Sequence, residues 1–168
     1  MAISMYQISV PLFLKTLGNL SAILDKGAAF AEAKKVDPAV LLGYRLAPDM
    51  LNLTRQVQIA SDHARRASCR LAGVEPPVFE DNETSFAELK ARIDKTIAFI
   101  NTLKAAQFES AESREITLKI GGKDKTLSGQ TYFLHNALPN FFFHTTTAYA
   151  ILRHCGVEIG KMDFIGQL

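Results

Sequence analysis

The four histidines have the widest chemistry of any side chains in this sequence, because a neutral imidazole can accept a hydrogen bond, move a proton or bind a transition metal. His63 and His144 lie within long stretches of helical periodicity, where their rings can face a protein interior. His154 falls in the last turn of its stretch, where an imidazolium complements the helix carbonyl groups and needs no further role. His135 precedes that stretch, as a cap or a surface residue. His63 and His144 are therefore the leading candidates for function.

The segment that carries His144 is predicted to be one helix over residues 138–156. An apolar stripe recurs in it at three- and four-residue steps: Phe141, His144, Ala148, Ile151 and Cys155. Pro139 suits the first turn, where a missing N–H costs nothing, and Gly156 suits the left-handed position just past the end. His144 is thus expected in the interior, either as a hydrogen-bonded core residue or as a ligand.

The helix that must position His63 is predicted from about residue 49 to residue 72. Its seam has the spacing of near-parallel bundle packing and consists of Met50, Leu53, Val57, Ala60, Ala64, Ala67 and Leu71. Because the centre of the seam is all alanine, either a neighbouring helix approaches closely there or a gap is left. His63 flanks this centre, and Arg65, Arg66 and Arg70 are expected on a solvated face of the same helix.

Two further long helices are predicted from the apolar spacing. The first covers residues 4–34, and Pro11 inside it should either kink the helix or mark its real start. The other covers residues 86–106 and follows a capping box formed by Ser85 and Glu88.

A small β-hairpin is predicted just before the last helix. Apolar and polar residues alternate over 116–120, Gly121 and Gly122 supply the turn, and residues 123–127 return. Four helices with apolar stripes imply an all-α fold, a four-helix bundle with this hairpin inserted, in a single domain over residues 1–168. The length of the connections leaves both up-and-down and crossover topologies open.

Composition and charge argue against several classes of function. The 168 residues are 48% hydrophobic and 21% charged with a formal net charge of +2, which is ordinary for a soluble globular protein. No block of Lys and Arg is long enough to follow a phosphate backbone, so no nucleic-acid partner is expected. Lys15 interrupts the apolar run Val10–Leu14, so neither a signal peptide nor a membrane span is expected. With two cysteines and no Cys-x-x-Cys motif, a cytoplasmic location is predicted.

Several catalytic motifs are absent from the sequence. It has no Glu-x-x-His pair of the di-iron bundles, no His-Glu-x-x-His, no Gly-rich phosphate loop and no Gly-x-Ser-x-Gly. Cys155 falls at a helix C-terminus, where the dipole disfavours a thiolate, and Cys69 lies inside a helix without a base nearby in sequence. Both cysteines are predicted to be structural, which leaves the histidines as the candidates for chemistry.

The last predicted helix resembles a known family. The run from Phe143 to Val157 is similar to the final helix of the DinB/YfiT-like metalloenzyme superfamily. A closer likeness, to an uncharacterised bacterial branch of that superfamily, is carried by two motifs: Leu138-Pro139-Asn140-x-x-x-His144-x-Thr146-Thr147-Ala148-Tyr149 and Gly160-Lys161-x-Asp163-Phe164. This likeness extends over nearly the whole chain.

The resemblance implies a bundle that is often dimeric and carries a three-histidine metal site, with one ligand from the second helix and two from the last. By position His63 matches the first ligand and His144 the last. Asn140 stands where the remaining histidine is expected, and an amide oxygen is a feeble ligand for zinc or nickel beside an imidazole. His135 is a replacement only if the chain bends around Pro139.

Two interpretations follow. In the first, the protein binds a divalent metal, zinc or nickel, through His63, His144 and Asn140, and acts as a metal-dependent hydrolase or a thiol-dependent transferase. In the second, the metal site is degenerate. The protein is then a non-catalytic homodimer in which Asn140 and His144 hydrogen-bond each other or His63 and line a small-ligand pocket.

The pocket and the dimer surface have further candidate residues. Tyr149, His135 and Arg45 are candidates for the rim or lining of the pocket. The run Phe141–Phe143 covers more than one face of its helix, so it is expected to pack both the core and a surface shared with a second copy.

Overall fold

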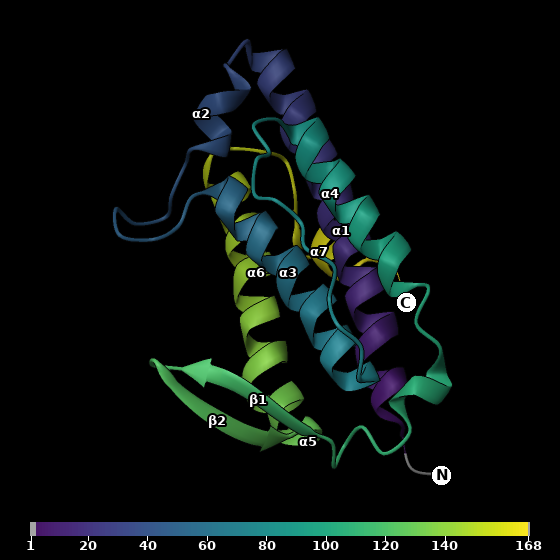
Figure 1. Cartoon of the computed structure of the whole chain (residues 1–168). Coiled ribbons are helices and arrows are strands. Elements are labelled where there is room, and N and C mark those ends of the chain that lie inside the picture. Colours follow the sequence, from purple (N-terminus) through teal and green to yellow (C-terminus); the bar gives the residue numbers. More distant parts are fainter. Residues whose placement is uncertain (1–2, 168) are drawn as a thin grey trace.

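The computed structural model describes residues 3–167 and contains a bundle of four long helices (Figure 1). The helices and strands in chain order are α1 (Met5–Lys34), α2 (Pro38–Leu42), α3 (Leu53–Ala72), α4 (Phe86–Ile100), η1 (Ala105–Phe108), β1 (Glu115–Ile120), β2 (Lys123–Ser128), α5 (Gly129–Tyr132), η2 (Phe133–Ala137), α6 (Leu138–His154) and α7 (Lys161–Ile165). The predicted four-helix bundle with a hairpin before the last long helix is therefore confirmed.

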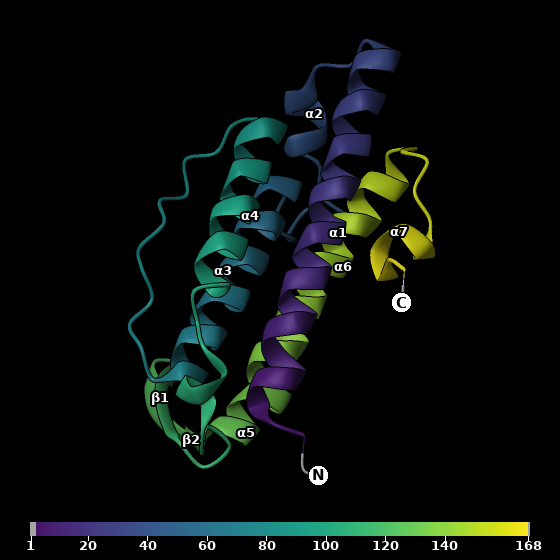
Figure 2. The same ribbon diagram turned by 90° about the vertical axis from the view of Figure 1, so that its right-hand side faces the viewer.

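The bundle contains one crossover connection. Figure 2 shows residues 74–85, here called the crossover segment, running back along the bundle from the end of α3 to the start of α4. As a result α3 and α4 point in the same direction, whereas α1 and α6 point the opposite way. The sequence left this choice of topology open, because connections of this length fit both an up-and-down and a crossover arrangement.

Helix α1 is continuous through Pro11. A capping box of Ser4 and Gln7 starts the helix, and its buried face includes Phe13, Leu17 and Leu24. Pro11 lies inside α1 without dividing it into two helices, and it does not mark the start, which is at Met5. By length and composition α1 is apolar enough to cross a membrane, and 44% of its most apolar 18-residue window is buried inside the protein.

Helix α3 begins at Leu53, later than the predicted residue 49. Asn52 caps it with a side-chain oxygen that accepts from the N–H of Arg55 at 3.0 Å, and the N–H of Leu53 donates to the carbonyl of Tyr44. This hydrogen bonding holds residues 44–52 as a loop, so Met50 lies outside the helix. The rest of the predicted seam, from Leu53 to Leu71, is buried.

Helix α4 is shorter than predicted, and the strands of the hairpin match the prediction to within one residue. Helix α4 ends at Ile100 rather than near residue 106, and the short 3₁₀-helix η1 follows. The hairpin pairs Glu115 with Ser128 and Ile120 with Lys123, and Gly121 and Gly122 in its turn have positive φ angles of 58° and 79°.

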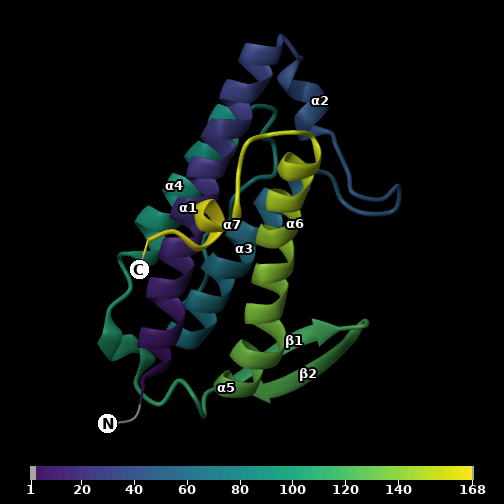
Figure 3. The ribbon, with the colours of Figure 1, turned by 180° about the vertical axis from the view of Figure 1, so that it is seen from behind.

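Pro139 lies in the first turn of α6, as predicted, but α6 does not begin the helical run. Helical structure begins at α5, passes through the π-helical segment η2, and continues directly into α6 (Figure 3). A π turn just before Pro139 relieves the clash between the proline ring and the carbonyl four residues earlier, which would break an ordinary helix. At the other end Gly156 has φ 94°, the predicted left-handed conformation.

The C-terminal segment packs on α1 and α6. The amide of Asn19 donates to the carbonyl of Phe164 at 2.9 Å, and Lys26 pairs with Asp163 at 2.6 Å. The ring of Phe164 meets that of Tyr149 edge to face, with centroids 5.9 Å apart. These contacts fix α7 on the bundle.

Candidate functional site

His63 on α3 and His144 on α6 lie side by side in the structure. Their ring centroids are 5.8 Å apart and the ring planes differ by 16°. His144 is buried, with 9% of its surface exposed, and His63 is partly buried. The alanine seam explains the approach, because Ala60, Ala64 and Ala67 are fully buried and leave room for α6 against α3.

A chain of hydrogen bonds fixes the protonated nitrogen of His144. The side-chain nitrogen of Gln56 donates to the backbone carbonyl of Leu51 at 3.0 Å, and its Oε1 lies 2.7 Å from Nδ1 of His144. Since a backbone carbonyl can only accept, the amide of Gln56 must present its oxygen to the imidazole. Nδ1 therefore carries the proton, and Nε2 of His144 holds a free lone pair.

Both imidazoles are neutral at neutral pH. The pKa of His63 falls from its ordinary 6.5 to about 4 because of burial, the neighbouring His144 and the charges of Arg66 and Arg70, which outweigh the opposite effect of Asp62. Burial also lowers the pKa of His144. The pair thus offers hydrogen-bond acceptors rather than positive charges.

The residues around the pair do not complete a three-ligand metal site. The amide nitrogen of Asn140 donates to the backbone carbonyl of Asn136 at 2.7 Å, so this side chain folds back along its own helical run. Within the described residues the Asn140 amide has this partner rather than His144, so the hydrogen bond between Asn140 and His144 that one interpretation expected is not formed. Within residues 3–167 no three His, Cys, Asp or Glu side chains are grouped so that they could hold a metal ion.

The three other candidate pocket residues have their contacts elsewhere. Tyr149 packs on Phe164, and Arg45 donates from Nη1 to the carbonyl of Met50 at 2.6 Å and so holds its own loop. His135 is exposed in η2. Among the six residues singled out from the sequence, the structure brings only His63 and His144 together.

A buried ionic network that was not predicted from the sequence lies beside His63. Arg92 of α4 and Arg65 of α3 each expose only 2% of their side chains, and both bind Oδ1 of Asp62, at 2.8 Å and 2.7 Å. Arg92 also binds Asp81 at 2.8 Å and Glu83 at 3.0 Å, both from the crossover segment. The expectation that Arg65 lies on a solvated face is therefore wrong.

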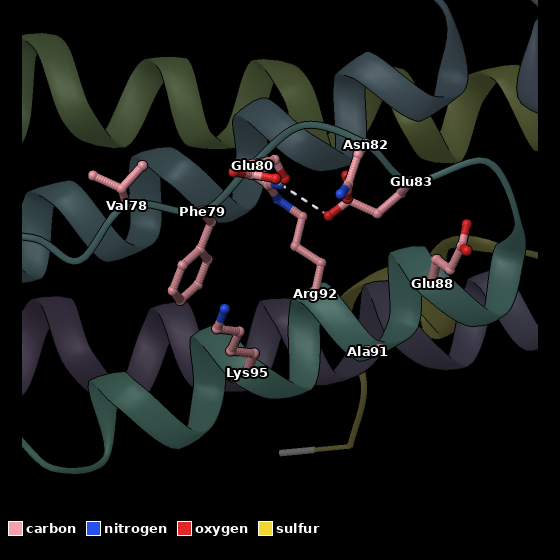
Figure 4. A pocket seen from close by; sticks show the side chains of 9 residues that line it. All are labelled: Val78, Phe79, Glu80, Asn82, Glu83, Glu88, Ala91, Arg92 and Lys95. Carbon is pink, nitrogen blue, oxygen red and sulfur yellow. Dashed lines mark hydrogen bonds and ion pairs between the residues drawn. The ribbon is translucent and has the colours of Figure 1, made fainter.

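The network holds the crossover segment against α3 and α4. Burial alone would lower the pKa of Arg92, but the hydrogen bond that Arg92 donates to Glu83 and the charges of Glu83, Asp62 and Asp81 outweigh burial and raise the pKa. Phe79 lies between two cations, with the guanidinium carbon of Arg65 4.3 Å and the ammonium of Lys95 4.2 Å from its ring centroid. In Figure 4 Arg92 reaches from α4 to Glu83 beside an open cavity of about 490 Å³.

A smaller groove connects this network to His63. It has a volume of about 250 Å³ and is lined by Arg55, Gln58, Ile59, Asp62, His63, Arg66, Arg70 and Asp81. One sequence signal was available for it: Gln56, His63 and Arg70 are polar residues at seven-residue steps, so they share one stripe of α3. The ion pairs to Arg92 had no such signal, since Asp62 and Arg92 are thirty residues apart.

Comparisons with known proteins agree with this architecture. The sequence model of the family described as "Domain of unknown function (DUF1993)" matches residues 5–165. The crystal structure of a DinB family member protein from Shewanella denitrificans is 45% identical in sequence and has a TM-score of 0.90, covering 97% of this chain and 92% of that one. No curated protein matches the chain. The resemblance inferred from the last helix is confirmed: the chain belongs to the DUF1993 family, an uncharacterised DinB-like family.

Proposed function

We propose that this protein is a small-ligand-binding bundle in which His63 and His144 act as neutral hydrogen-bond acceptors, and that its metal site is degenerate. The observation that carries the proposal is the bond between Gln56 and His144, which fixes the proton on Nδ1 and leaves Nε2 free. Asn140, at the position of the third family ligand, is engaged with Asn136 instead. A buried acceptor of this kind favours ligands that carry an O–H or N–H group.

The metal-dependent enzyme is the competing function. A bound divalent ion such as zinc or nickel would supply Lewis-acid chemistry, and His63 and His144 are the two imidazoles placed to hold it. A catalytic zinc site ordinarily has three protein ligands, and the described residues supply two imidazoles and no third strong ligand. We therefore place ligand binding ahead of metal catalysis.

Elemental analysis separates the two functions. Protein purified without a metal-affinity tag is analysed for zinc and nickel, together with H144A and the control H154A, which removes an exposed histidine bonded to Tyr44. We expect much less than one equivalent of metal in all three proteins. One equivalent in the wild type and in H154A that is lost in H144A would overturn the proposal.

Ligand binding is tested by NMR with a panel of small alcohols, amides and hydroxy acids. The probe signals are the ring nitrogens and carbon-bound protons of His63 and His144. We expect compounds with a donor group to shift both rings in the wild type and to lose that effect in H144F. If no compound shifts either ring, or if the shifts persist in H144F, the pair is not a ligand site.

We also propose that the protein forms a homodimer through the outer face of α6. Pro139, Phe143, Thr146 and Ala150 form a stripe there and line an open apolar groove of about 520 Å³ with Leu46 and Met50. Phe143 is 55% exposed beside that groove, so a two-fold axis would place each Phe143 in the groove of the other copy. We expect F143D to be monomeric by light scattering, and V78D, at an exposed apolar residue elsewhere, to stay dimeric. A monomeric wild type, or a dimeric F143D, would contradict this arrangement.

A further inference from the structure

The groove of about 250 Å³ on the outer face of α3 has an excess of positive charge. Guanidinium groups of Arg55, Arg66 and Arg70 line it, together with two carboxylates, Asp62 and Asp81. Those two carboxylates also form ion pairs with buried arginines: Asp62 binds Arg65 and Arg92, and Asp81 binds Arg92. The carboxylate charge is thus shared with buried arginines, and the guanidinium groups that line the groove are only partly neutralised.

Arg70 is the least neutralised of these cations. Arg55 pairs with Asp81 at 2.6 Å, and Arg66 pairs with Asp62 at 2.9 Å. Arg70 instead donates from Nη1 to the hydroxyl of Tyr132 at 2.9 Å and lies over that ring, and within residues 3–167 it has no ion pair with a carboxylate. The phenol orients the guanidinium without cancelling its charge, which is how a protein prepares a cation for an oxyanion.

His63 adds an acceptor at the same groove. A neutral imidazole always has one nitrogen with a free lone pair. In the part of the chain that the structure describes, the ring of His63 stacks with His144 and has no side-chain hydrogen bond of its own. A hydroxyl or amine beside an anionic group would therefore find a partner here.

We propose that this groove binds a small organic oxyanion, a carboxylate or a phosphate, held by the guanidinium groups of Arg66 and Arg70, with a neighbouring hydroxyl that donates to His63. The inference rests on the proposed ligand-binding function and names the class of ligand. A volume of about 250 Å³ lies below the usual range for drug-sized ligands, so it suits a molecule of a few carbon atoms rather than a nucleotide.

Calorimetric titration at constant ionic strength tests the anion site, with glycolate, acetate and inorganic phosphate as the three probes. We expect saturable millimolar binding in the wild type and at least a roughly tenfold loss in R70Q, which corresponds to about 1.4 kcal/mol. R153Q, which changes an exposed arginine in the last turn of α6 that does not line the groove, should bind like the wild type. R70K keeps the charge and should keep most of the affinity, which separates loss of charge from loss of folding.

The probes also distinguish the two sources of an oxyanion. Binding of glycolate without phosphate assigns a carboxylate ligand, and binding of phosphate without glycolate assigns a phosphate ester. For a carboxylate we expect glycolate to bind about fivefold more tightly than acetate, because it adds one hydrogen bond, and we expect H63F to abolish that preference.

Failure of the anion site and failure of the proposed ligand-binding function would give different experimental results. No saturable binding by any probe, or equal binding in R70Q and R153Q, would overturn the anion site while leaving the donor-dependent shifts of His63 and His144 intact. Stoichiometric metal lost in H144A would overturn the proposed function even if Arg70-dependent anion binding persisted.

Discussion

At the scale of single residues, Gln56 decides what His144 can do. The side-chain amide of Gln56 donates to the carbonyl of Leu51 and accepts from the imidazole of His144. These two hydrogen bonds fix the orientation of the amide and keep the proton of the imidazole on Nδ1. A ring whose tautomer is fixed by its neighbour presents the same nitrogen to every ligand. The orientation of the histidine pair is therefore set before any ligand arrives.

Replacing Gln56 with methionine should cost stability and release the ring of His144. The substitution keeps the volume and removes the acceptor for Nδ1, so we expect a loss of about 1–3 kcal/mol in the free energy of unfolding. Urea denaturation measures that loss, and nitrogen NMR should show a mixture of tautomers. Q130M, at an exposed glutamine, should change stability by less than about 0.5 kcal/mol. An unchanged tautomer in Q56M would show that another group fixes His144.

The lowered pKa of His63 predicts an acid-dependent stability. The unfolded chain binds a proton at His63 near pH 6.5, whereas the folded protein binds it only near pH 4, so the unfolded state holds more protons between these values. Stability should fall as the pH drops from about 6.5 to about 4 and level off below. Since the ring is partly exposed, we expect the total loss to be about 2 kcal/mol.

Unfolding midpoints in urea between pH 7.5 and 4.5 check this expectation. H63Q should lose the part of the slope that belongs to His63, and the control H154Q should keep it. Equal slopes in the two variants would assign the acid sensitivity to other groups.

At the scale of elements, the crossover segment is held to the helices mainly by charge. Its carboxylates Asp81 and Glu83 bind Arg92, which is almost completely buried, and Asp62 of α3 completes the set. A buried cation whose partners are removed is strongly destabilising, whereas a paired one is close to neutral. The segment therefore depends on the whole set of carboxylates rather than on any single contact.

D62N should be the most disruptive conservative change in this network. It removes one charge from both Arg65 and Arg92, each 2% exposed, so we expect a loss of about 2–4 kcal/mol in the free energy of unfolding. D25N removes a surface ion pair with Lys90 and should cost less than about 1 kcal/mol. Chemical denaturation of both variants tests the contrast, which fails if the two losses are equal.

Replacement by alanine is expected to have opposite effects on stability at two glycines. A Cβ at Gly129 would lie 1.9 Å from the backbone oxygen of Ala111, whereas a Cβ at Gly18 inside α1 would meet nothing within 4 Å. We expect G129A to move the start of α5 away from residue 111 and to destabilise the protein by more than about 2 kcal/mol. G18A should stabilise it by about 0.5–1 kcal/mol. Thermal unfolding of the two variants measures both signs, and a stable G129A would contradict the close contact.

Local patterns predicted the helices well where one chemical rule acts alone. The capping box at Ser85 marks the start of α4, and the alanine seam of α3 marks the face that meets α6. The start of α6 was predicted, but the helical residues before it were missed, because Pro139 satisfies two rules at once: it suits a first turn, and it also suits the residue after a π turn. Only packing in three dimensions selects between them.

At the scale of the whole molecule, the pairing of distant charges lies beyond local sequence patterns. His144 was predicted to face the interior because helical spacing fixes the face of a residue, and His63 was placed beside the seam for the same reason. Nothing in the spacing identifies which carboxylate meets Arg92, since Asp62, Asp81 and Glu83 come from two different segments. A crossover connection brings them together, and its path depends on the complete fold.

The hydrogen bond between Arg70 and Tyr132 has a practical consequence. The chain has four tyrosines and no tryptophan, so tyrosine rings dominate its intrinsic near-ultraviolet fluorescence. Tyr132 is 1% exposed, and its hydroxyl accepts from the same guanidinium that faces the groove. A ligand in the groove that draws Arg70 toward itself would change the environment of the buried Tyr132 ring. The fluorescence of Tyr132 is therefore a label-free signal for ligand binding in the groove.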